Sequence, residues 1–179
     1  MPAPRLLLID RDGVINRDSD QYIKSVAEWE PLPGSLNAIA DLTRAGFQVV
    51  IITNQSGVGR GLFSVETLNQ IHTEMCTAVE LAGGRIAGIY YCPHRPEDAC
   101  ECRKPKPKLL LDAAVAFGAS LQDVAFIGDK LSDVEAALAA GARPILVGPQ
   151  ALDAVAQTVE RSHDLESAAS VLIREAGDR

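Results

Sequence analysis

The sequence predicts an α/β fold in which a parallel, doubly wound sheet carries helices on both of its faces. Short and almost wholly apolar runs, such as Arg5–Ile9 and Phe47–Ile52, are typical of strands that are buried on both sides. Segments with apolar residues at helical spacing alternate with these runs, as Leu36 and Ile39 do in Ser35–Ala45. Strand–helix alternation of this kind is typical of a Rossmann-like sheet.

The individual elements are justified by their apolar patterns and by the residues at their ends. Gly46 follows the helix Ser35–Ala45 at a typical stop position, and Ser64 is a typical N-cap for a helix that runs to about Ala82. Gly141 ends another helix in the same way. The other predicted elements are strands at Phe47–Ile52, Ile86–Tyr91, Val124–Ile127 and Pro144–Val147, helices at Lys108–Phe117 and Leu131–Ala140, and one or two closing helices.

Composition places the chain among ordinary globular proteins. Apolar residues make up 47% and charged residues 23% of its 179 residues, which predicts one domain over residues 1–179 that needs no disulfides. The formal net charge of −7 argues against general binding to nucleic acid or to an anionic membrane. The apolar stretches are only as long as strands, and the first residues lack the pattern of a signal peptide. We therefore expect a cytoplasmic protein, and a monomer.

The cysteines indicate a metal site. Residues 92–105 form a proline-containing loop with four potential ligands, which are Cys92, His94, Cys100 and Cys102. Three thiolates and one imidazole are a closed ligand set for structural Zn²⁺, and in a reducing compartment such a cluster favours metal over disulfides. The alternative is a chance group of buried cysteines. The remaining Cys76 is expected in the core, while His72 and His163, which have no partner cluster, are expected at the surface or satisfied in the interior.

Polar clusters follow the predicted strands at their carboxyl ends, which in a parallel sheet lie along one edge. Asp10 and Asp12 follow the first strand, and Asp129 follows the fourth. Three carboxylates brought together repel one another unless they share a cation, and Mg²⁺ prefers oxygen ligands. The alternative for each aspartate taken alone is a turn or helix cap.

Two further groups suit a phosphate. Thr53, after the second strand, offers a hydroxyl and a run of main-chain N–H groups, although a strand-end turn would also explain it. Lys104 leaves the cysteine loop at the same edge and would balance a dianion, whereas the adjacent Lys106 and Lys108 are expected in solvent.

In this order, these residues resemble the four motifs of the haloacid dehalogenase superfamily, most of whose members are Mg²⁺-dependent phosphatases. The motifs are Asp10-x-Asp12-Gly13, Thr53, Lys104 and Gly128-Asp129-x3-Asp133, and the match spans residues 5–147. Within the superfamily the chain is similar to the heptose-1,7-bisphosphate 7-phosphatases, and next to the histidinol-phosphate phosphatases. The sequence from Thr53 to Gly61 favours the heptose enzymes, whereas the short zinc loop occurs in both branches.

The resemblance implies a role for each motif. Asp10 would attack phosphorus and form an aspartyl-phosphate, and Asp12 would be the general acid and then the base. Thr53 and Lys104 would bind the transferring phosphoryl group, and Asp133 would orient the metal site. The Mg²⁺ ligands would be Asp10, Asp129 and the main-chain carbonyl of Asp12. The product would serve nucleotide-activated heptose and lipopolysaccharide core synthesis.

Substrate contacts are expected from the loops around this edge. The candidates are Asp18, Asp20, Tyr22, Asn54, Gln55, Ser56, Arg60, Arg103 and Lys130, with Arg60, Arg103 and Lys130 suited to a second phosphate. A solvated acidic loop would also explain Asp18 and Asp20. Residues 57–61, rich in glycine, are expected to form a flexible rim. The longest segment between motifs, Thr53 to Lys104, is filled by predicted elements and by the zinc loop, so no large cap domain is expected.

Three functions compete at this point. The first is a sugar-bisphosphate phosphatase, which the excess of cations near the site favours. The second is the same chemistry on histidinol phosphate, whose amine would favour carboxylates at the rim. The third is a zinc-binding interaction module without catalytic activity, against which the complete set of motif residues argues.

Overall fold

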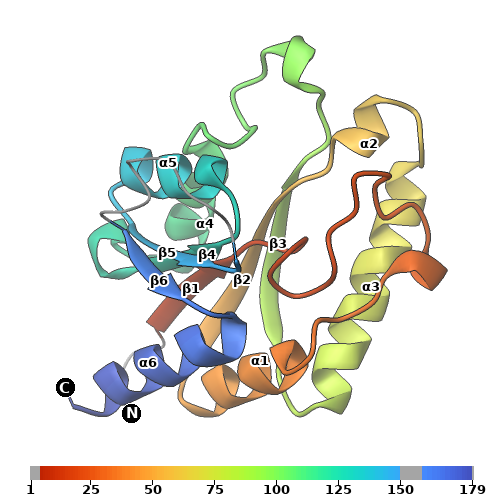
Figure 1. The fold of residues 1–179 in the computed structure, drawn as a ribbon. Coiled ribbons are helices and arrows are strands. Elements are labelled where there is room, and N and C mark those ends of the chain that lie inside the picture. The colour runs from red at the N-terminus through yellow and green to blue at the C-terminus, as the bar shows by residue number, and fades with distance from the viewer. Residues whose placement is uncertain (1–4, 150–158, 179) are drawn as a thin grey trace.

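A six-stranded parallel sheet forms the centre of the protein, which we describe from a computed structural model over residues 5–149 and 159–178 (Figure 1). The strand order is β3-β2-β1-β4-β5-β6, so the chain winds outward from β1 in both directions. The strands are β1 (Arg5–Ile9), β2 (Phe47–Asn54), β3 (Ile86–Cys92), β4 (Ala125–Gly128), β5 (Arg143–Val147) and β6 (Glu160–Ser162). This confirms the predicted doubly wound α/β fold.

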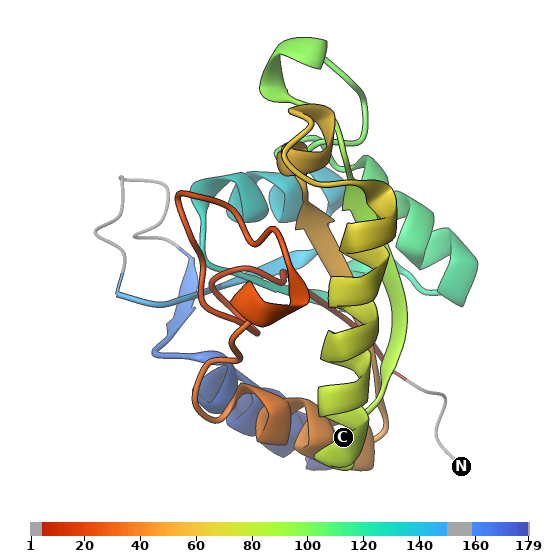
Figure 2. The same ribbon diagram turned by 90° about the vertical axis from the view of Figure 1, so that its right-hand side faces the viewer.

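Helices cover both faces of the sheet (Figures 1 and 2). They are α1 (Ser35–Arg44), α2 (Ser56–Gly59), α3 (Val65–Leu81), α4 (Lys108–Phe117), α5 (Leu131–Ala140) and α6 (Leu165–Gly177). Short 3-10 turns lie at Val26–Glu28, Pro96–Asp98 and Leu121–Asp123. Helices α1, α3 and α6 pack on one face, and α4 and α5 pack on the other, which leaves the strand ends free to carry polar groups.

The hydrophobic core has two layers because the strands alternate their side chains between the faces. In β1, Leu7 and Ile9 join the layer beneath α1, α3 and α6, whereas Leu6 and Leu8 join the layer beneath α4 and α5. The four side chains are at most 5% exposed. This burial on both sides explains why the strand is apolar at successive positions.

Element ends follow local chemistry closely. The predicted helices Lys108–Phe117 and Leu131–Ala140 are confirmed at both ends, and the Oγ of Ser64 accepts a hydrogen bond from the N–H of Thr67, 3.1 Å away, as an N-cap does. Gly46 and Gly141 have the positive φ that helix ends require.

Among the strands and α-helices of the described residues, two were not predicted. Strand β6, Glu160–Ser162, is short and polar, so it lacks an apolar run. The glycine-rich segment that we expected as a rim contains a helical turn, α2.

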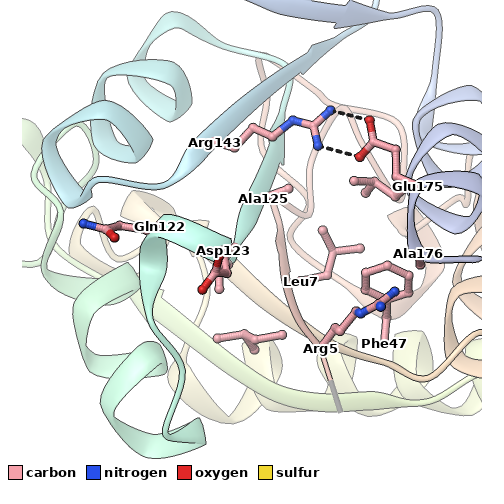
Figure 3. A pocket seen from close by; sticks show the side chains of 12 residues that line it. Arg5, Leu7, Phe47, Gln122, Asp123, Ala125, Arg143, Glu175 and Ala176 are labelled. Atoms are coloured by element: carbon pink, nitrogen blue, oxygen red, sulfur yellow. Dashed lines mark hydrogen bonds and ion pairs between the residues drawn. The ribbon is translucent and has the colours of Figure 1, made fainter. Parts of the chain in front are cut away.

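Ion pairs join β5 to β6 and to α6 at the amino ends of the strands. Arg143 on β5 lies 2.7 Å from a carboxylate oxygen of Glu175 on α6 (Figure 3). Arg143 also lies 2.6 Å from a carboxylate oxygen of Glu160 on β6. Arg143 and Glu175 border a small cavity of about 120 Å³. The predicted motif residues lie at the other end of the strands. Within the described residues, no helix combines the length and apolar character needed to cross a membrane.

Candidate active site

The predicted motif residues come together around one cavity at the carboxyl ends of the strands. Asp10 and Asp12 follow β1, Thr53 lies near the end of β2, and Lys104 leaves the cysteine loop after β3. The cavity has a volume of about 290 Å³, and all four of these residues line it. The topology therefore joins groups that are as many as 94 positions apart, from Asp10 to Lys104.

Three buried carboxylates form a cluster here, and two of them, Asp10 and Asp133, line the cavity. Oxygen atoms of Asp10, Asp129 and Asp133 lie within 4.8 Å of one another. Burial raises the pKa of Asp10 well above its usual range, and repulsion from Asp133 and Asp129 raises it further against the opposing effect of Lys104. Burial also raises the pKa of Asp129, to about 7, with Lys130 opposing and Asp133 adding to the shift. Such a group of carboxylates is suited to a cation.

Lys104 supplies one positive charge within the carboxylate group. Its Nζ lies 3.0 Å from Asp10 Oδ1 and 2.6 Å from Asp133 Oδ1, and the side chain is 3% exposed. Burial alone would lower the pKa of Lys104, but the attraction of Asp10 and Asp133 raises it above its ordinary value. The ammonium group therefore stays charged next to the carboxylate that would attack phosphorus.

The main chain of Lys104 is fixed by Asn54. The amide of Asn54 donates to the carbonyl of Lys104 and accepts from its N–H, both at 3.1 Å. Asn54 thus lines the cavity and also holds the end of the cysteine loop against the end of β2.

The donor set fits a divalent cation that prefers oxygen ligands. Asp129 Oδ1 is buried and has no hydrogen-bond partner within the described part of the chain. Asp133 Oδ2 is occupied, because it accepts from the N–H groups of Asp129 (3.2 Å) and Lys130 (3.1 Å). A side chain at Gly13, whose φ is +82°, would collide with the Asp129 carboxylate. Asp129 is thus free to bind a cation, whereas Asp133 orients the turn that carries it.

Asp12 lies in a different electrostatic environment. Its Oδ1 accepts from Asn16 Nδ2 at 2.9 Å, and its Oδ2 accepts from Gln55 Nε2 at 2.9 Å. Burial would raise the pKa of Asp12, but the charge of Arg11 and these hydrogen bonds lower it below its usual value. Gln55 also donates to Thr53 Oγ1 at 2.9 Å, so this amide links two of the motif residues.

Most of the expected substrate contacts line the cavity. Those that do so are Asp18, Asp20, Tyr22, Asn54, Gln55, Ser56, Arg103 and Lys130. Arg60 is not among the described lining residues, and its guanidinium lies 3.5 Å from Glu97 in the cysteine loop. Lys130 forms an ion pair of 2.7 Å with Asp18 across the rim. The structure thus brings eight of these nine candidates to the cavity and directs Arg60 elsewhere.

Sequence reasoning missed three residues that line the cavity, which are Ser19, Ile23 and Ser132. Ser19 lies between the predicted Asp18 and Asp20, and Ser132 lies between Asp129 and Asp133, so their neighbours were the available signal.

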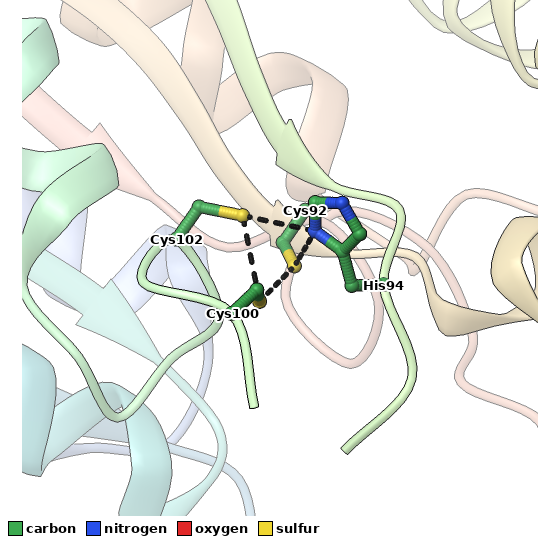
Figure 4. A group of neighbouring side chains, drawn as sticks. All are labelled: Cys92, His94, Cys100 and Cys102. Carbon is green, nitrogen blue, oxygen red and sulfur yellow. Dashed lines mark hydrogen bonds between the residues drawn. The ribbon is translucent and has the colours of Figure 1, made fainter. Parts of the chain in front are cut away.

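The four predicted zinc ligands face one another (Figure 4). The sulfur of Cys92 lies 3.5 Å from that of Cys100 and 3.6 Å from His94 Nδ1, and Cys102 completes the group at 3.3 Å from His94 and 3.6 Å from Cys100. Thiolates about 2.3 Å from one Zn²⁺ would lie about 3.8 Å apart, and a thiolate and an imidazole nitrogen at about 2.1 Å would lie about 3.6 Å apart, so these spacings fit a tetrahedral site. The four cysteines are free thiols, and no disulfide competes for the ligands.

The remaining predicted residues lie as follows. His72 is buried and lies 3.2 Å from Arg11, so the interior alternative is correct for it, whereas His163 is exposed. Cys76 is half-buried and lies outside the core clusters, so the prediction of a core position was wrong.

Comparisons with known proteins agree with this geometry. The model of the family described as haloacid dehalogenase-like hydrolase matches residues 3–141. A D-glycero-beta-D-manno-heptose-1,7-bisphosphate 7-phosphatase of Pseudomonas putida is 50% identical over 143 residues, which cover 80% of this chain and 82% of that protein. The enzyme of the same name from Neisseria meningitidis serogroup B is 48% identical over 143 residues, which cover 80% of this chain and 76% of the relative.

Solved structures show the same likeness. A crystal structure of D,D-heptose 1,7-bisphosphate phosphatase from B. bronchiseptica, complexed with magnesium and phosphate, superposes with a TM-score of 0.89 at 43% identity. The match covers 96% of this chain and 99% of that one. The corresponding enzyme from Burkholderia thailandensis gives a TM-score of 0.71 at 37% identity, covering 94% and 98% of the two chains.

Proposed function

The chain belongs to the haloacid dehalogenase-like hydrolase family, and from this premise we propose that it is a Mg²⁺-dependent phosphatase that removes the C7 phosphate of D-glycero-beta-D-manno-heptose 1,7-bisphosphate. The observation that carries the proposal is the position of Asp10, whose carboxylate lines the cavity 3.0 Å from the ammonium of Lys104. A nucleophile beside a fixed cation suits a phosphate ester. The related heptose-1,7-bisphosphate 7-phosphatases supply the substrate class.

The reaction has two steps. In the first step a carboxylate oxygen of Asp10 attacks phosphorus, the bond from phosphorus to the C7 oxygen breaks, and Asp12 gives its proton to the departing alkoxide. In the second step Asp12 takes a proton from water, and the water attacks phosphorus of the aspartyl-phosphate. The bond from phosphorus to the Asp10 oxygen breaks, the Asp10 carboxylate is restored, and inorganic phosphate leaves. Thr53 and Lys104 bind the equatorial oxygens, over which negative charge is spread.

The order of protonation states follows from the surroundings of the two aspartates. Asp12 must bind a proton before the first step, although Arg11 and the neighbouring amides favour its charged form. An approaching phosphate dianion would add negative charge beside Asp12 and favour the protonated form. Asp10 must be charged to attack, and Lys104 helps to keep it so.

Two metals fit the described residues. Asp10, Asp129 and the main-chain carbonyl of Asp12 would hold Mg²⁺, which supplies positive charge that offsets repulsion between the carboxylates and the phosphate. Cys92, His94, Cys100 and Cys102 would hold Zn²⁺ in a closed structural site. The zinc would fix the loop that ends at Arg103 and Lys104, so its effect on catalysis would be indirect.

The cations at the rim support a bisphosphate. Arg103 and Lys130 line the cavity beyond the nucleophile and are suited to a second phosphate or to sugar hydroxyls. Asp18 and Asp20, also on the rim, are suited to sugar hydroxyls.

A substrate panel tests the proposal. The purified protein with Mg²⁺ is assayed for phosphate release on both anomers of heptose 1,7-bisphosphate, on histidinol phosphate and on simple phosphate esters. We expect kcat/KM to be highest for a heptose bisphosphate, and ³¹P NMR to show that the C1 phosphate remains. A higher kcat/KM for histidinol phosphate would instead assign the protein to the competing branch. Loss of the C1 phosphate would contradict the assigned regiochemistry.

A further inference from the structure

Arg11 lies between the two catalytic aspartates in sequence but its side chain points into the interior. It is 0% exposed and is not among the described residues that line the cavity. Its Nε donates to Asp12 Oδ1 at 3.0 Å, and its Nη2 donates to Oδ1 at 2.8 Å and to Oδ2 at 3.0 Å. Both oxygens of the general acid are therefore held by one guanidinium group.

The second amino group of this guanidinium contacts a histidine on α3. Arg11 Nη1 lies 3.2 Å from His72 Nε2, and these residues are 61 positions apart. His72 is 6% exposed, and its ring packs against that of Tyr91 on β3 with centroids 5.9 Å apart. Tyr91 and the helix thus fix the imidazole, and the imidazole in turn fixes Arg11.

The direction of this hydrogen bond follows from the two side chains. An arginine keeps its proton, so Nη1 is the donor and Nε2 of His72 must accept. Burial, together with the charge of Arg11, lowers the pKa of His72 to about 4, which agrees with a neutral imidazole. His72 is therefore an acceptor with its remaining ring proton on Nδ1.

Asp12 is left with little freedom by these contacts. Asn16 and Gln55 add hydrogen bonds to the carboxylate, and its side chain is only 16% exposed. The exposed part is what the cavity can reach, because Arg11 occupies the interior side. Rotation of the guanidinium would pull the carboxylate away from the position in which it faces the leaving group.

We propose that Arg11 and His72 are positioning residues for Asp12: His72 holds the guanidinium, and the guanidinium holds the carboxylate that protonates the leaving oxygen. This inference rests on the proposed phosphatase function. Helix α3 would then contribute to catalysis through the contact of His72 with Arg11, although His72 does not line the cavity. A merely structural contact would lower kcat/KM equally for every substrate, whereas misplacement of the general acid lowers kcat/KM selectively for those substrates whose leaving group needs a proton.

The test compares two leaving groups. A sugar or alkyl phosphate releases an alkoxide that needs the proton of Asp12, but p-nitrophenyl phosphate releases a stable phenolate that does not. The parameter kcat/KM reports the steps up to aspartyl-phosphate formation, so it isolates departure of the leaving group. We expect His72→Leu to lower kcat/KM about tenfold or more for the alkyl ester and less than threefold for the aryl ester.

Matched variants separate position from packing. His72→Gln offers an amide oxygen that Arg11 can reach, so we expect it to restore most of the alkyl-ester activity. Val79→Ala is the control for loosened packing of α3, because Val79 is buried on this helix and belongs to its core cluster. Val79→Ala should change kcat/KM for the alkyl ester and for the aryl ester by the same factor. If His72→Leu gives no folded protein by circular dichroism, His72→Asn replaces it, because its shorter amide lies farther from the guanidinium.

Each outcome decides the inference. A selective loss on the alkyl ester with rescue by His72→Gln supports it, whereas equal losses on both esters, or no loss on either, overturn it. If the wild-type protein hydrolyses another alkyl phosphate but not heptose bisphosphate, the proposed substrate is wrong and the same comparison on that ester still decides the role of His72. A wild-type protein that hydrolyses no phosphate ester overturns both proposals.

Discussion

Lys104 and Asp133 form a buried ion pair of 2.6 Å, and the same ammonium lies 3.0 Å from Asp10. Asp133 is thus a partner of the cation that faces the nucleophile, in addition to its bonds with the N–H groups of Asp129 and Lys130. One carboxylate at the start of α5 therefore orients both the phosphate-binding lysine and the turn of the metal-binding aspartate.

Loss of the Lys104 charge should destabilise the protein. In Lys104→Met the carboxylates of Asp10 and Asp133 lose their cation, and breaking a buried ion pair costs roughly 3–5 kcal/mol of the free energy of unfolding. Urea denaturation with EDTA present would measure this loss. Lys108→Met is the control, because Lys108 makes an exposed pair with Asp112 that should contribute less than about 1 kcal/mol. If both variants lost the same small amount of the free energy of unfolding, Lys104 would not be needed to balance the buried charges.

Replacement of the nucleophile should abolish turnover without unfolding the protein. In Asp10→Asn the amide cannot attack phosphorus as a carboxylate does. The substitution also removes one negative charge from a crowded group, so the free energy of unfolding without Mg²⁺ should not fall. Phosphate release and urea denaturation measure the two effects. Turnover near the wild-type value in a clean preparation would exclude Asp10 as the nucleophile.

Arg103 and Arg60 should differ in their effect on substrate choice. Arg103 lines the cavity, whereas Arg60 pairs with Glu97, so Arg103→Ala removes a substrate contact and Arg60→Ala is its matched control. A charged contact contributes roughly 1.5–3 kcal/mol, so Arg103→Ala should lower kcat/KM for heptose bisphosphate about ten- to a hundredfold. Its effect on p-nitrophenyl phosphate should be small.

If Arg60→Ala lowered kcat/KM for heptose bisphosphate and Arg103→Ala did not, Arg60 and not Arg103 would be the substrate contact. Equal losses on both substrates for Arg103→Ala would show that Arg103 acts on the transferred phosphate itself.

Chelation should remove the two metals under different conditions. Elemental analysis should find about one zinc per chain, held by three thiols and one imidazole. Mild EDTA treatment should remove Mg²⁺ first, because its oxygen site is weaker, and added Mg²⁺ should restore activity while zinc remains bound. Recovery of activity by Zn²⁺ alone, without Mg²⁺, would reverse the assigned roles. Cys102→Ser should lower the zinc content and leave Mg²⁺ binding to the carboxylates.

His72 should make stability depend on pH. Burial, followed by the charge of Arg11, lowers its pKa from 6.5 to about 4, so the unfolded chain binds a proton at higher pH than the folded one. The stability associated with neutral His72 is fully present above about pH 6.5 and is lost as the pH falls toward 4. Between about pH 7.5 and pH 5 the wild type should lose roughly 2 kcal/mol relative to His72→Gln. Urea denaturation of both proteins at the two pH values would test this, and parallel curves would contradict it.

The sequence predicts this site well because its parts are set by chain order and strand ends. Apolar runs locate β1, β2 and β4, and parallel topology then brings Asp10, Thr53 and the turn of Asp129 to one edge. Strand β6 was not predicted because Glu160–Ser162 has no apolar pattern. This strand forms by pairing with β5.

Side-chain contacts between distant segments of the chain could not be predicted, because a local sequence pattern does not specify them. The pairing of Arg60 with Glu97 and that of Arg11 with His72 each join segments that only the folded chain brings together. A signal for His72 was present, however. It lies four residues after Leu68 and three before Met75, which places it on the buried stripe of α3.

The cysteine loop is held at both of its ends by the last residue of β2 and the residue that follows it. Gln55 N–H donates to the carbonyl of Cys92 at 2.7 Å where the loop begins, and Asn54 exchanges two hydrogen bonds with Lys104 where it ends. The span between these anchors extends beyond the sheet edge (Figure 1). Insertions or deletions between His94 and Cys100 would therefore alter how far the loop projects while leaving Lys104 in register with Asp10. Loop length is thus a property that can diverge between relatives, or be engineered, separately from the chemistry of the nucleophile.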